Sequence, residues 1–429
     1  MDLFSRFKKD YFNYLVSIIL PALISGVSIP VFKHLLGAEG YGKFSIWLNA
    51  VLIITAVSSG WITQSIIRLF PASENKYSFS RKAIKLSLET QLIFFAPVFF
   101  TSWFISKDIF LAILCSLVLL MTSLQFTVLP VIQSGFLSRK IITSESIRIL
   151  TYVGLALLLL KLSGISYIYS LFIAVFISYT FSLIYLGNQA YKLFHNEHSI
   201  ASNKNQNPKL FKSFFKYGAP LSLWFIFSYL FSYIDKLFMY KYMGAEAQGN
   251  YQAIFDLLFR GVSMIMSPVL TSLFPILTSA YTRGNNKEIR KLMKKIISYE
   301  IIGFLLSSVL YWWFADRLLL SLLKIPNTFS FKLMGFIVLC ATFIWQIAIL
   351  VQKRFELKQR TFYLLAMAFF AFLVQLLFYI IFKDLNNLLV YPLGFLLSTF
   401  VYLLLISATE LLTISKLTTE KLKYRIFKF

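Results

Sequence analysis

Apolar runs long enough to cross a lipid bilayer recur along the whole chain, with short polar segments between them. A membrane-spanning helix needs about 20 predominantly apolar residues. The pattern predicts an all-α integral membrane protein with about twelve spans and no large soluble domain. The predicted spans are residues 14–33, 44–66, 86–106, 109–134, 148–163, 166–186, 217–240, 252–279, 297–316, 331–351, 361–382 and 388–412.

Basic residues fall unequally on the two sets of loops that these spans define. Thirty-one Lys and Arg residues lie in the two terminal tails and the loops on their side, and ten lie on the opposite side. Cytoplasmic loops carry the excess of basic residues. We therefore expect a multi-pass protein with both termini in the cytoplasm. An odd number of spans would scramble the alternation, so the charge pattern also supports the count.

The amino-acid composition limits the kinds of molecule that this protein is expected to bind. Only 14% of the residues are charged, against about 25% in soluble domains. The net charge of +24 lies in short loops, so it indicates topology and attraction to anionic membrane lipid, and we expect no nucleic acid partner. Cys115 and Cys340 lie inside apolar runs, and the three histidines have no metal-ligand spacing. We therefore expect no metal and no cofactor.

A short motif occurs twice. Gly37-Ala38-Glu39 recurs as Gly244-Ala245-Glu246, and Gly42 and Phe44 are matched by Gly249 and Tyr251, all at an offset of 207 residues. Each copy lies between the first two spans of its half. Two weaker matches follow: Leu69-Phe70-Pro71 with Leu273-Phe274-Pro275, and the segment from Gln133 to Phe136 with the segment from Gln352 to Phe355.

The repeat predicts two lobes of six helices each. Because six is even, both lobes have the same orientation, and an axis along the membrane normal should relate them. We expect an N-terminal lobe over residues 1–198, a cytoplasmic linker rich in Asn, Lys and Ser over 199–212, and a C-terminal lobe over 213–429. A parallel two-lobed repeat around a central cavity is typical of transporters. A duplicated scaffold without transport is the alternative.

These motifs carry a resemblance to a known family. The segment from Leu36 to Phe44, Arg68 with Pro71, and Tyr233-Ile234-Asp235-Lys236 before the second motif copy resemble the polysaccharide biosynthesis family of Wzx-type O-antigen flippases. That family belongs to the multidrug/oligosaccharidyl-lipid/polysaccharide exporter superfamily. The resemblance covers the whole chain and implies a MATE-like fold.

The resemblance also implies a function. Such a flippase is a transporter and not an enzyme. It moves an undecaprenyl-pyrophosphate-linked oligosaccharide, the repeat unit of O-antigen, capsule or exopolysaccharide, to the outer leaflet of the bacterial inner membrane by alternating access. A coupling ion, proton or sodium, could drive it. A polysaccharide polymerase and a chain-length regulator are the protein partners that the resemblance suggests.

Moving an anionic headgroup through hydrocarbon requires a hydrated cationic cavity, because a charge in mid-bilayer costs several kcal/mol. Arg260 is the first candidate for substrate binding, since it is the single basic residue well inside a predicted span, roughly 13 Å deep. Its alternative role is an ion pair with Asp256, four residues earlier. Lys33 and Arg68, at the ends of spans one and two, could bind pyrophosphate or could be ordinary boundary cations.

Asp235, Lys236 and Asp256 are the candidates for ion coupling or gating. The alternative for Asp235-Lys236 is a helix-end pair whose lysine reaches the membrane interface. The polar run from Ser58 to Ser65 in span two suits a cavity wall or helix packing through small residues. Glu89, Glu145, Glu300 and Glu410 lie near the cytoplasmic boundary, and we expect them to be helix-end or loop partners of Lys and Arg rather than proton carriers.

Two other functions remain open at this point. A multidrug or small-molecule antiporter of the same superfamily would share the fold, but a cationic cargo favours acidic residues inside the spans, and this chain has few. A membrane-embedded polysaccharide polymerase or ligase usually needs a large outer loop, and all the predicted outer loops are short. The chain has no phosphate-binding loop of the Gly-x-x-x-x-Gly-Lys kind, so direct use of ATP is not expected.

Overall fold

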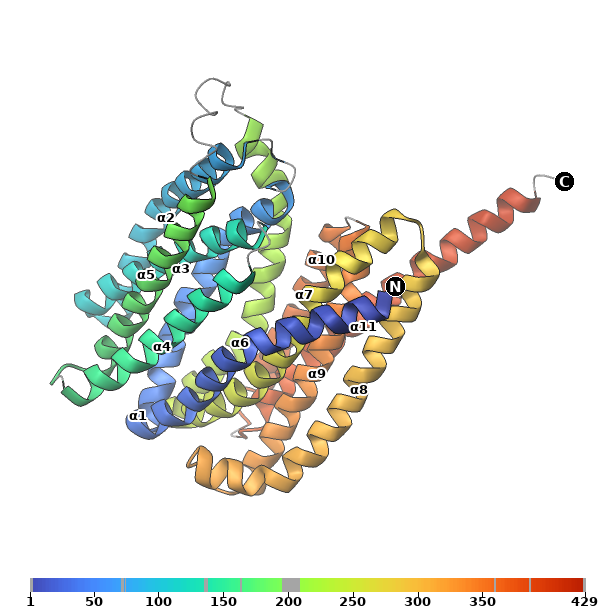
Figure 1. The fold of residues 1–429 in the computed structure, drawn as a ribbon. Helices are drawn as coiled ribbons and strands as arrows, with labels where there is room; N and C mark the ends of the chain where they lie inside the picture. The colour runs from blue at the N-terminus through green and yellow to red at the C-terminus, as the bar shows by residue number, and fades with distance from the viewer. Residues whose placement is uncertain are drawn as a thin grey trace. The chain divides into compact units, whose positions relative to one another are not determined.

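The structure is a computed structural model. It describes residues 3–70, 73, 75–134, 138–162, 164–194, 209–358, 360–385 and 387–426. Every regular element in these ranges is a helix, as the apolar runs predict (Figure 1). The elements are α1 (Leu3–Leu69), α2 (Lys76–Ser106), α3 (Ile109–Ser134), α4 (Ser138–Leu162), α5 (Tyr167–Phe194), α6 (Lys209–Phe255), the π-helical turn η3 (Asp256–Arg260), α7 (Gly261–Thr282), α8 (Asn286–Asp316), the π-helical turn η4 (Arg317–Leu322), α9 (Phe329–Leu357), α10 (Thr361–Phe382) and α11 (Val390–Ile426).

The predicted spans coincide with these helices. Nine helices among the described residues are long and apolar enough to cross a membrane, and the first of them, Gly26–Ile67, contains parts of two predicted spans. Predicted spans seven and eight fall on α6, η3 and α7. The fifth span is longer than predicted. Its helix, α4, begins at Ser138 rather than at residue 148. Glu145 and Arg148 lie within this helix and form an ion pair on it.

The first glycine of each motif copy makes a turn between two successive predicted spans. Gly37 interrupts α1 with φ 68° and ψ 172°, and Gly244 interrupts α6 with φ 88° and ψ 171°. Backbone with positive φ is readily adopted by glycine alone among the residue types. In Figure 1 the first turn is visible where α1 reverses its course. The repeat in the sequence is therefore also a repeat of backbone geometry.

The chain forms two compact units. One comprises Asn13–Leu257, and the other comprises Leu258–Phe429 with Met1–Phe12. The first unit joins sequence from both predicted lobes, because α6 packs on α1. The predicted linker at 199–212 lies mostly outside the described residues, as do His195 and His198, and the lobe boundaries stay a prediction.

Small and hydroxyl side chains let α6 approach α1 closely in the first unit. Gly60 faces Ser222, whose hydroxyl donates to the Ala56 carbonyl at 3.2 Å. A Cβ on Gly218 would overlap the backbone of Trp61. The Ser65 hydroxyl donates to the Phe214 carbonyl at 2.8 Å. Helices in membranes associate through such small residues, which bring backbones together.

The same polar run also binds α1 to α3. The hydroxyls of Thr55 and Thr122 lie 2.8 Å apart, and the Thr63 hydroxyl donates to the Phe126 carbonyl at 2.7 Å. Ser58, Ser59 and Ser65 are fully buried. Of the two interpretations of this run, helix packing is therefore confirmed, and these three serines do not form a cavity wall.

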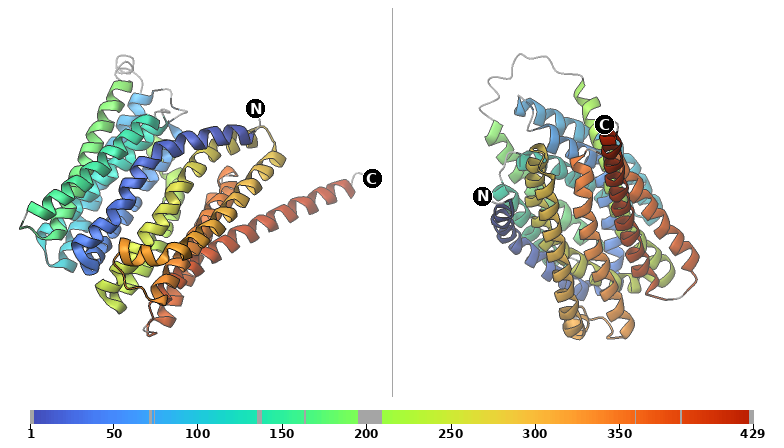
Figure 2. Two further views of the ribbon diagram at one scale, coloured as in Figure 1. Left: turned by 60° about the horizontal axis from the view of Figure 1, so that its bottom comes forward. Right: turned by 90° about the vertical axis from the view of Figure 1, so that its right-hand side faces the viewer.

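Helices α2 to α5 complete the first unit (Figure 2). In this part α2 packs on α3, α3 on α5, and α4 on α5. Loop residue Asp108 caps α3 by accepting the Leu111 amide at 3.1 Å, and it also accepts the Tyr169 hydroxyl of α5. Partial burial raises the pKa of the Asp108 carboxyl, but these hydrogen bonds outweigh burial and hold the pKa below its ordinary value.

This lowered pKa predicts a small acid-sensitive contribution to stability. The contribution is present above the unfolded-state pKa of about 4 and is lost as pH falls through the lower folded-state value. Tyr169→Phe removes one donor, so we expect it to cost about 1 kcal/mol at neutral pH. Thermal unfolding in detergent over the acid range checks this. An acid-side slope in Tyr169→Phe equal to that of the wild type would contradict it.

In the second unit, α7, α8 and α9 pack around two apolar clusters, and α11 packs on α9 and α10. One cluster includes Leu273, Leu292 and Leu350, and the other centres on Tyr311 and Phe343. Hydroxyl groups tie the helices at defined points. The Tyr311 hydroxyl donates to the Lys332 carbonyl at 2.7 Å, the Tyr379 hydroxyl to the Tyr391 carbonyl at 2.7 Å, and the Tyr402 hydroxyl to Gln352 Oε1 at 2.8 Å. Buried polar groups satisfied in this way fix the register of neighbouring helices.

Candidate functional site

The two motif copies meet directly within the first unit. A Cβ on Gly249 would overlap the Ala38 carbonyl oxygen, and a Cβ on Gly42 would lie 2.5 Å from the Ala245 carbonyl oxygen. These two contacts are equivalent under the repeat, because each joins a glycine to the alanine of the other copy. Glycine is required at both positions, since no other residue leaves room for the opposing backbone. We refer to Ala38, Gly42, Ala245 and Gly249 as the motif contact.

Polar side chains surround the motif contact. The Gln248 amide nitrogen donates to the Ser45 hydroxyl at 3.2 Å; Gln248 precedes Gly249, and Ser45 lies three residues after Gly42. The Tyr41 hydroxyl donates to Asp256 Oδ2 at 2.7 Å. All four side chains are buried. The first motif copy is thus bonded to the second copy and to the start of the π-helical turn.

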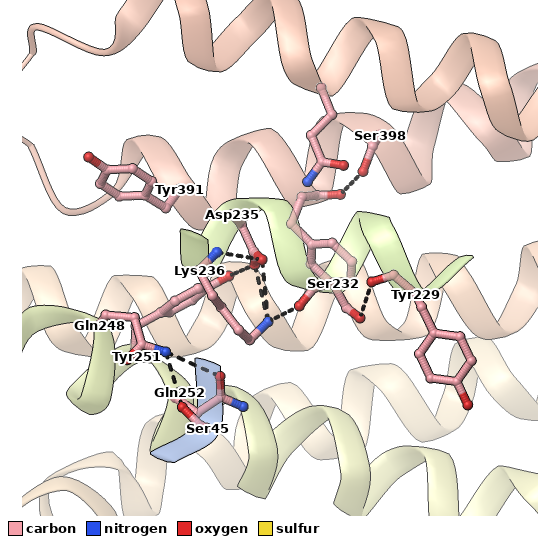
Figure 3. Close-up of polar contacts among 12 residues, drawn as sticks. Ser45, Tyr229, Ser232, Asp235, Lys236, Gln248, Tyr251, Gln252, Tyr391 and Ser398 are labelled. Atoms are coloured by element: carbon pink, nitrogen blue, oxygen red, sulfur yellow. Dashed lines mark hydrogen bonds and ion pairs between the residues drawn. The ribbon is translucent and has the colours of Figure 1, made fainter. Parts of the chain in front are cut away.

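Asp235 and Lys236 form a buried ion pair on α6 (Figure 3). The Lys236 Nζ lies 3.3 Å from Asp235 Oδ1 and also donates to the Ser232 carbonyl. The Tyr251 hydroxyl donates to Asp235 Oδ2 at 2.5 Å. The exposed fractions of Asp235 and Lys236 are 0% and 1%. Lys236 therefore does not reach the membrane interface, which was one of the two interpretations of this dipeptide.

An aromatic ring completes the environment of the lysine. The Lys236 Nζ lies 3.2 Å from the centre of the Phe255 ring and 5.4 Å from that of Tyr251. A cation over an aromatic face is attracted by about 2 kcal/mol when water is excluded. Tyr251 and Phe255 follow Gly244 on α6, so the turn at Gly244 folds them back onto Asp235 and Lys236. The sequence carried no signal for this aromatic contact.

Asp235 and Asp256 share one arrangement. Each is a buried carboxylate that accepts a tyrosine hydroxyl, from Tyr251 and Tyr41 respectively. Ionisable residues buried within membrane-spanning segments are costly and are functional candidates by default. The structure thus places two of the three predicted coupling residues in equivalent tyrosine-bound environments.

Arg260 lies at the end of η3, where the chain passes from α6 to α7. Its side chain is exposed, whereas Asp256 at the start of the same turn is 3% exposed. A π-helical turn places five residues where an α-helix places four, and such turns frequently occur at functional sites. Asp256 and Arg260 thus begin and end one π-helical turn, and the predicted ion pair between them stays a prediction.

The other predicted binding cations lie on α1. Lys33 is 4% exposed and precedes the Gly37 turn by one helical turn. Arg68 lies one residue before the end of α1, and its side chain is outside the described part of the chain, as are Pro71 and the side chain of Glu410. A joint role of Arg68, Lys33 and Arg260 in substrate binding therefore stays a prediction.

The structure shows a further cation inside a membrane helix that was not predicted from the sequence. The sequence had indicated Arg260 alone at such a depth. Arg148 lies ten residues into α4 and donates to Glu145 Oε2 at 2.7 Å. The Gln125 amide of α3 donates to Glu145 Oε1 at 2.8 Å, and the Arg148 guanidinium lies 5.1 Å from the ring centre of Tyr179. The signal was the Glu-x-x-Arg spacing, which puts both side chains on one helix face.

Comparison with known proteins gives a family and a fold. The model of a family described as "Polysaccharide biosynthesis protein" matches residues 7–281, more than half of the chain. A comparison with curated protein sequences gave no match.

Three solved structures are similar over nearly the whole chain. A MATE in its bent conformation has a TM-score of 0.69 at 12% identity, covering 98% of this chain and 97% of its own. An inward-facing multidrug resistance MATE transporter of the MOP superfamily has a TM-score of 0.68 at 13% identity, covering 98% of this chain and 99% of its own. A MOP superfamily transporter from Pyrococcus furiosus has a TM-score of 0.66 at 13% identity, covering 94% of this chain and 96% of its own. At these identities the similarity establishes the MATE-like fold alone.

Proposed function

Because the chain belongs to the polysaccharide biosynthesis family of membrane transporters, we propose that it is a flippase for a lipid-linked oligosaccharide. The substrate would be an undecaprenyl-pyrophosphate-linked repeat unit of O-antigen, capsule or exopolysaccharide. It would move from the cytoplasmic to the outer leaflet of a bacterial inner membrane. Both termini would lie in the cytoplasm, as the 31 to 10 distribution of basic residues indicates.

The observation that carries this proposal is the exposed guanidinium of Arg260 inside a predicted span. Arginine in contact with hydrocarbon costs several kcal/mol, so a guanidinium at this depth must face water or an anion. The proposed transport requires a hydrated cavity between the two lobes, residues 1–198 and 213–429, and Arg260 would line it. Arginine binds phosphate oxygens through its forked donors, which suits a pyrophosphate headgroup.

The motif contact supports alternating access. It joins the two halves of the repeat at the end that the charge pattern assigns to the outer face, so it would close the cavity on that side. Alternating access needs this contact to break and reform. Backbone packing through glycine can do so without leaving a large side chain unpaired.

Asp235, Lys236 and Asp256 supply groups for energy coupling. A tyrosine-bound carboxylate inside the membrane can exchange its partner for a proton or a sodium ion when the helices move. Loss of flipping in membranes without an ion gradient would support this role.

A multidrug antiporter is the rival function with the same fold. The Pyrococcus furiosus structure is described as one in which the reverse polarity of the binding pocket suggests a different function. Differences in the polarity of the binding pocket can therefore accompany this fold. The excess of basic over acidic residues in this chain favours an anionic cargo.

The test is complementation of a strain that lacks the gene. We expect deletion to abolish surface polysaccharide and to leave the undecaprenyl-linked unit in the inner leaflet. Arg260→Ala should lower flipping about 10- to 100-fold, the effect of losing one charged hydrogen bond of about 1.5–3 kcal/mol. Arg260→Lys keeps the positive charge but lacks the forked donors of arginine. Its flipping rate should lie between those of the wild type and Arg260→Ala.

Lys161→Ala is the matched control, because Lys161 is an exposed cation at the end of α4. It should complement fully. Units that reach the outer leaflet but stay unpolymerised in the deletion strain would overturn the flippase proposal in favour of a polymerase. Unchanged surface polysaccharide with new drug sensitivity would favour the antiporter.

A further inference from the structure

Glu300 is a buried carboxyl group in the second unit. It lies on α8, five residues beyond Lys295, where the apolar part of the helix begins. Its exposed fraction is 3%, whereas Lys295 and Tyr299 beside it in the sequence are exposed. Lysine and tyrosine mark membrane interfaces. Glu300 thus lies about one helical turn inside the basic end of the span, on the side of α8 that faces protein.

The packing of α8 on α9 places Glu300 opposite an amide. These helices run antiparallel, and the Phe304 and Phe343 ring centres lie 5.4 Å apart. One turn further toward the basic end, the same register puts Glu300 level with Gln346. Gln346 is also buried, and its Nε2 donates to the Ser263 hydroxyl of α7 at 3.0 Å. Glu300 therefore lies beside a neutral polar layer between two apolar clusters.

No opposite charge on the described parts of α7, α8 and α9 faces Glu300. Its Oε2 atom is buried without a hydrogen-bond partner among the described residues. The sequence of α7 contains no charged residue or histidine, and α9 has none between Lys332 and Lys353, near its two ends. On α8 the nearest charges are the exposed Lys294 and Lys295. The expectation that Glu300 is the partner of a boundary cation is therefore wrong for the described structure.

We propose that Glu300 is a proton-binding site that couples transport to the proton gradient. An isolated ionised carboxylate is too costly in apolar surroundings, whereas the neutral acid can share hydrogen bonds with amide and hydroxyl groups. Movement of α8 relative to α7 and α9 would open Glu300 to water at the basic end, one turn away, and release the proton there. The coupling role rests on the proposed function, and the proton-binding role does not.

Labelling with dicyclohexylcarbodiimide tests the proton-binding role in the purified full-length protein. This apolar reagent reacts with protonated carboxyl groups inside the membrane. We expect mass spectrometry to find the adduct on the peptide that contains Glu300, with a yield that falls as pH rises. Glu300→Gln should lose the adduct, and the exposed Glu89 is the internal control. An unlabelled Glu300 would overturn the proposal.

Uptake of the lipid-linked oligosaccharide into proteoliposomes tests the coupling role. Glu300→Gln retains the size and neutrality of the protonated acid. Its gradient-driven rate should be at least about ten-fold lower than that of the wild type, which corresponds to about 1.4 kcal/mol. Its gradient-independent exchange should remain. Full gradient dependence in Glu300→Gln would overturn coupling through Glu300. Wild-type vesicles that label at Glu300 but move no lipid-linked sugar would overturn the proposed function and leave the proton site standing.

Discussion

Asp235→Ala should lower the free energy of unfolding by about 3–5 kcal/mol, because it leaves the Lys236 ammonium buried without its counter-ion. Lys236 is 1% exposed, so it cannot turn its charge to water without unfolding part of α6. The Phe255 ring offsets a fraction of this cost. Lys236→Ala should be similarly damaging, since it strands the Asp235 carboxylate. Thermal unfolding in detergent measures both effects.

The double variant Asp235→Ala/Lys236→Met separates charge from packing. It removes both charges and keeps most of the apolar volume of the lysine, so it should recover much of the lost stability. If the double variant is as unstable as the sum of the two single variants, the ion pair is not what stabilises this site. A transport defect that persists in the stable double variant would assign the pair a role in coupling.

Glu39 and Lys43 provide the matched control for the buried pair. They also form an ion pair on the first unit, at 2.5 Å, but their side chains are 63% and 38% exposed. Breaking an exposed pair costs less than about 1 kcal/mol. Lys43→Ala should therefore unfold close to the wild-type temperature. An equal loss at both pairs would show that burial is not the cause.

Gly249→Ala should disrupt the motif contact, because its new Cβ would overlap the Ala38 carbonyl oxygen. Overpacking of this kind costs about 1–3 kcal/mol. If the motif contact forms in one transport state only, that cost shifts the population of the state about 5- to 150-fold. We expect reduced complementation by Gly249→Ala, and by Gly42→Ala as its repeat equivalent. Complementation and unfolding temperature are the measurements.

Gly154→Ala is the control for this prediction. Gly154 lies within α4, and a Cβ there has nothing within 4 Å. Alanine is favoured over glycine inside helices by about 1 kcal/mol, so this variant should be neutral or slightly stabilising. Similar behaviour of Gly249→Ala and Gly154→Ala would mean that the two motif copies need not approach.

The spans and the repeat follow from the amino-acid sequence. Apolar length is a local property, so the predicted spans coincide with helices even where α1 contains two of them and span eight continues from α6 through η3 into α7. Positive φ is also local, and the glycine that opens each motif copy is where the turns at Gly37 and Gly244 form. The family followed from the same residues.

Which of these residues meet depends on helix packing. Lys236 could have reached the interface, and the serines of span two could have lined a cavity. Packing of α6 on α1 and the turn at Gly244 buried them instead. Glu300 and Glu145 carried the same expectation, yet Glu300 lies without a charged partner among the described residues, whereas Glu145 binds Arg148. The role of a charge in the membrane depends on the groups that face it, and several of these come from segments distant in sequence, as Tyr41 does for Asp256 and Gln125 does for Glu145.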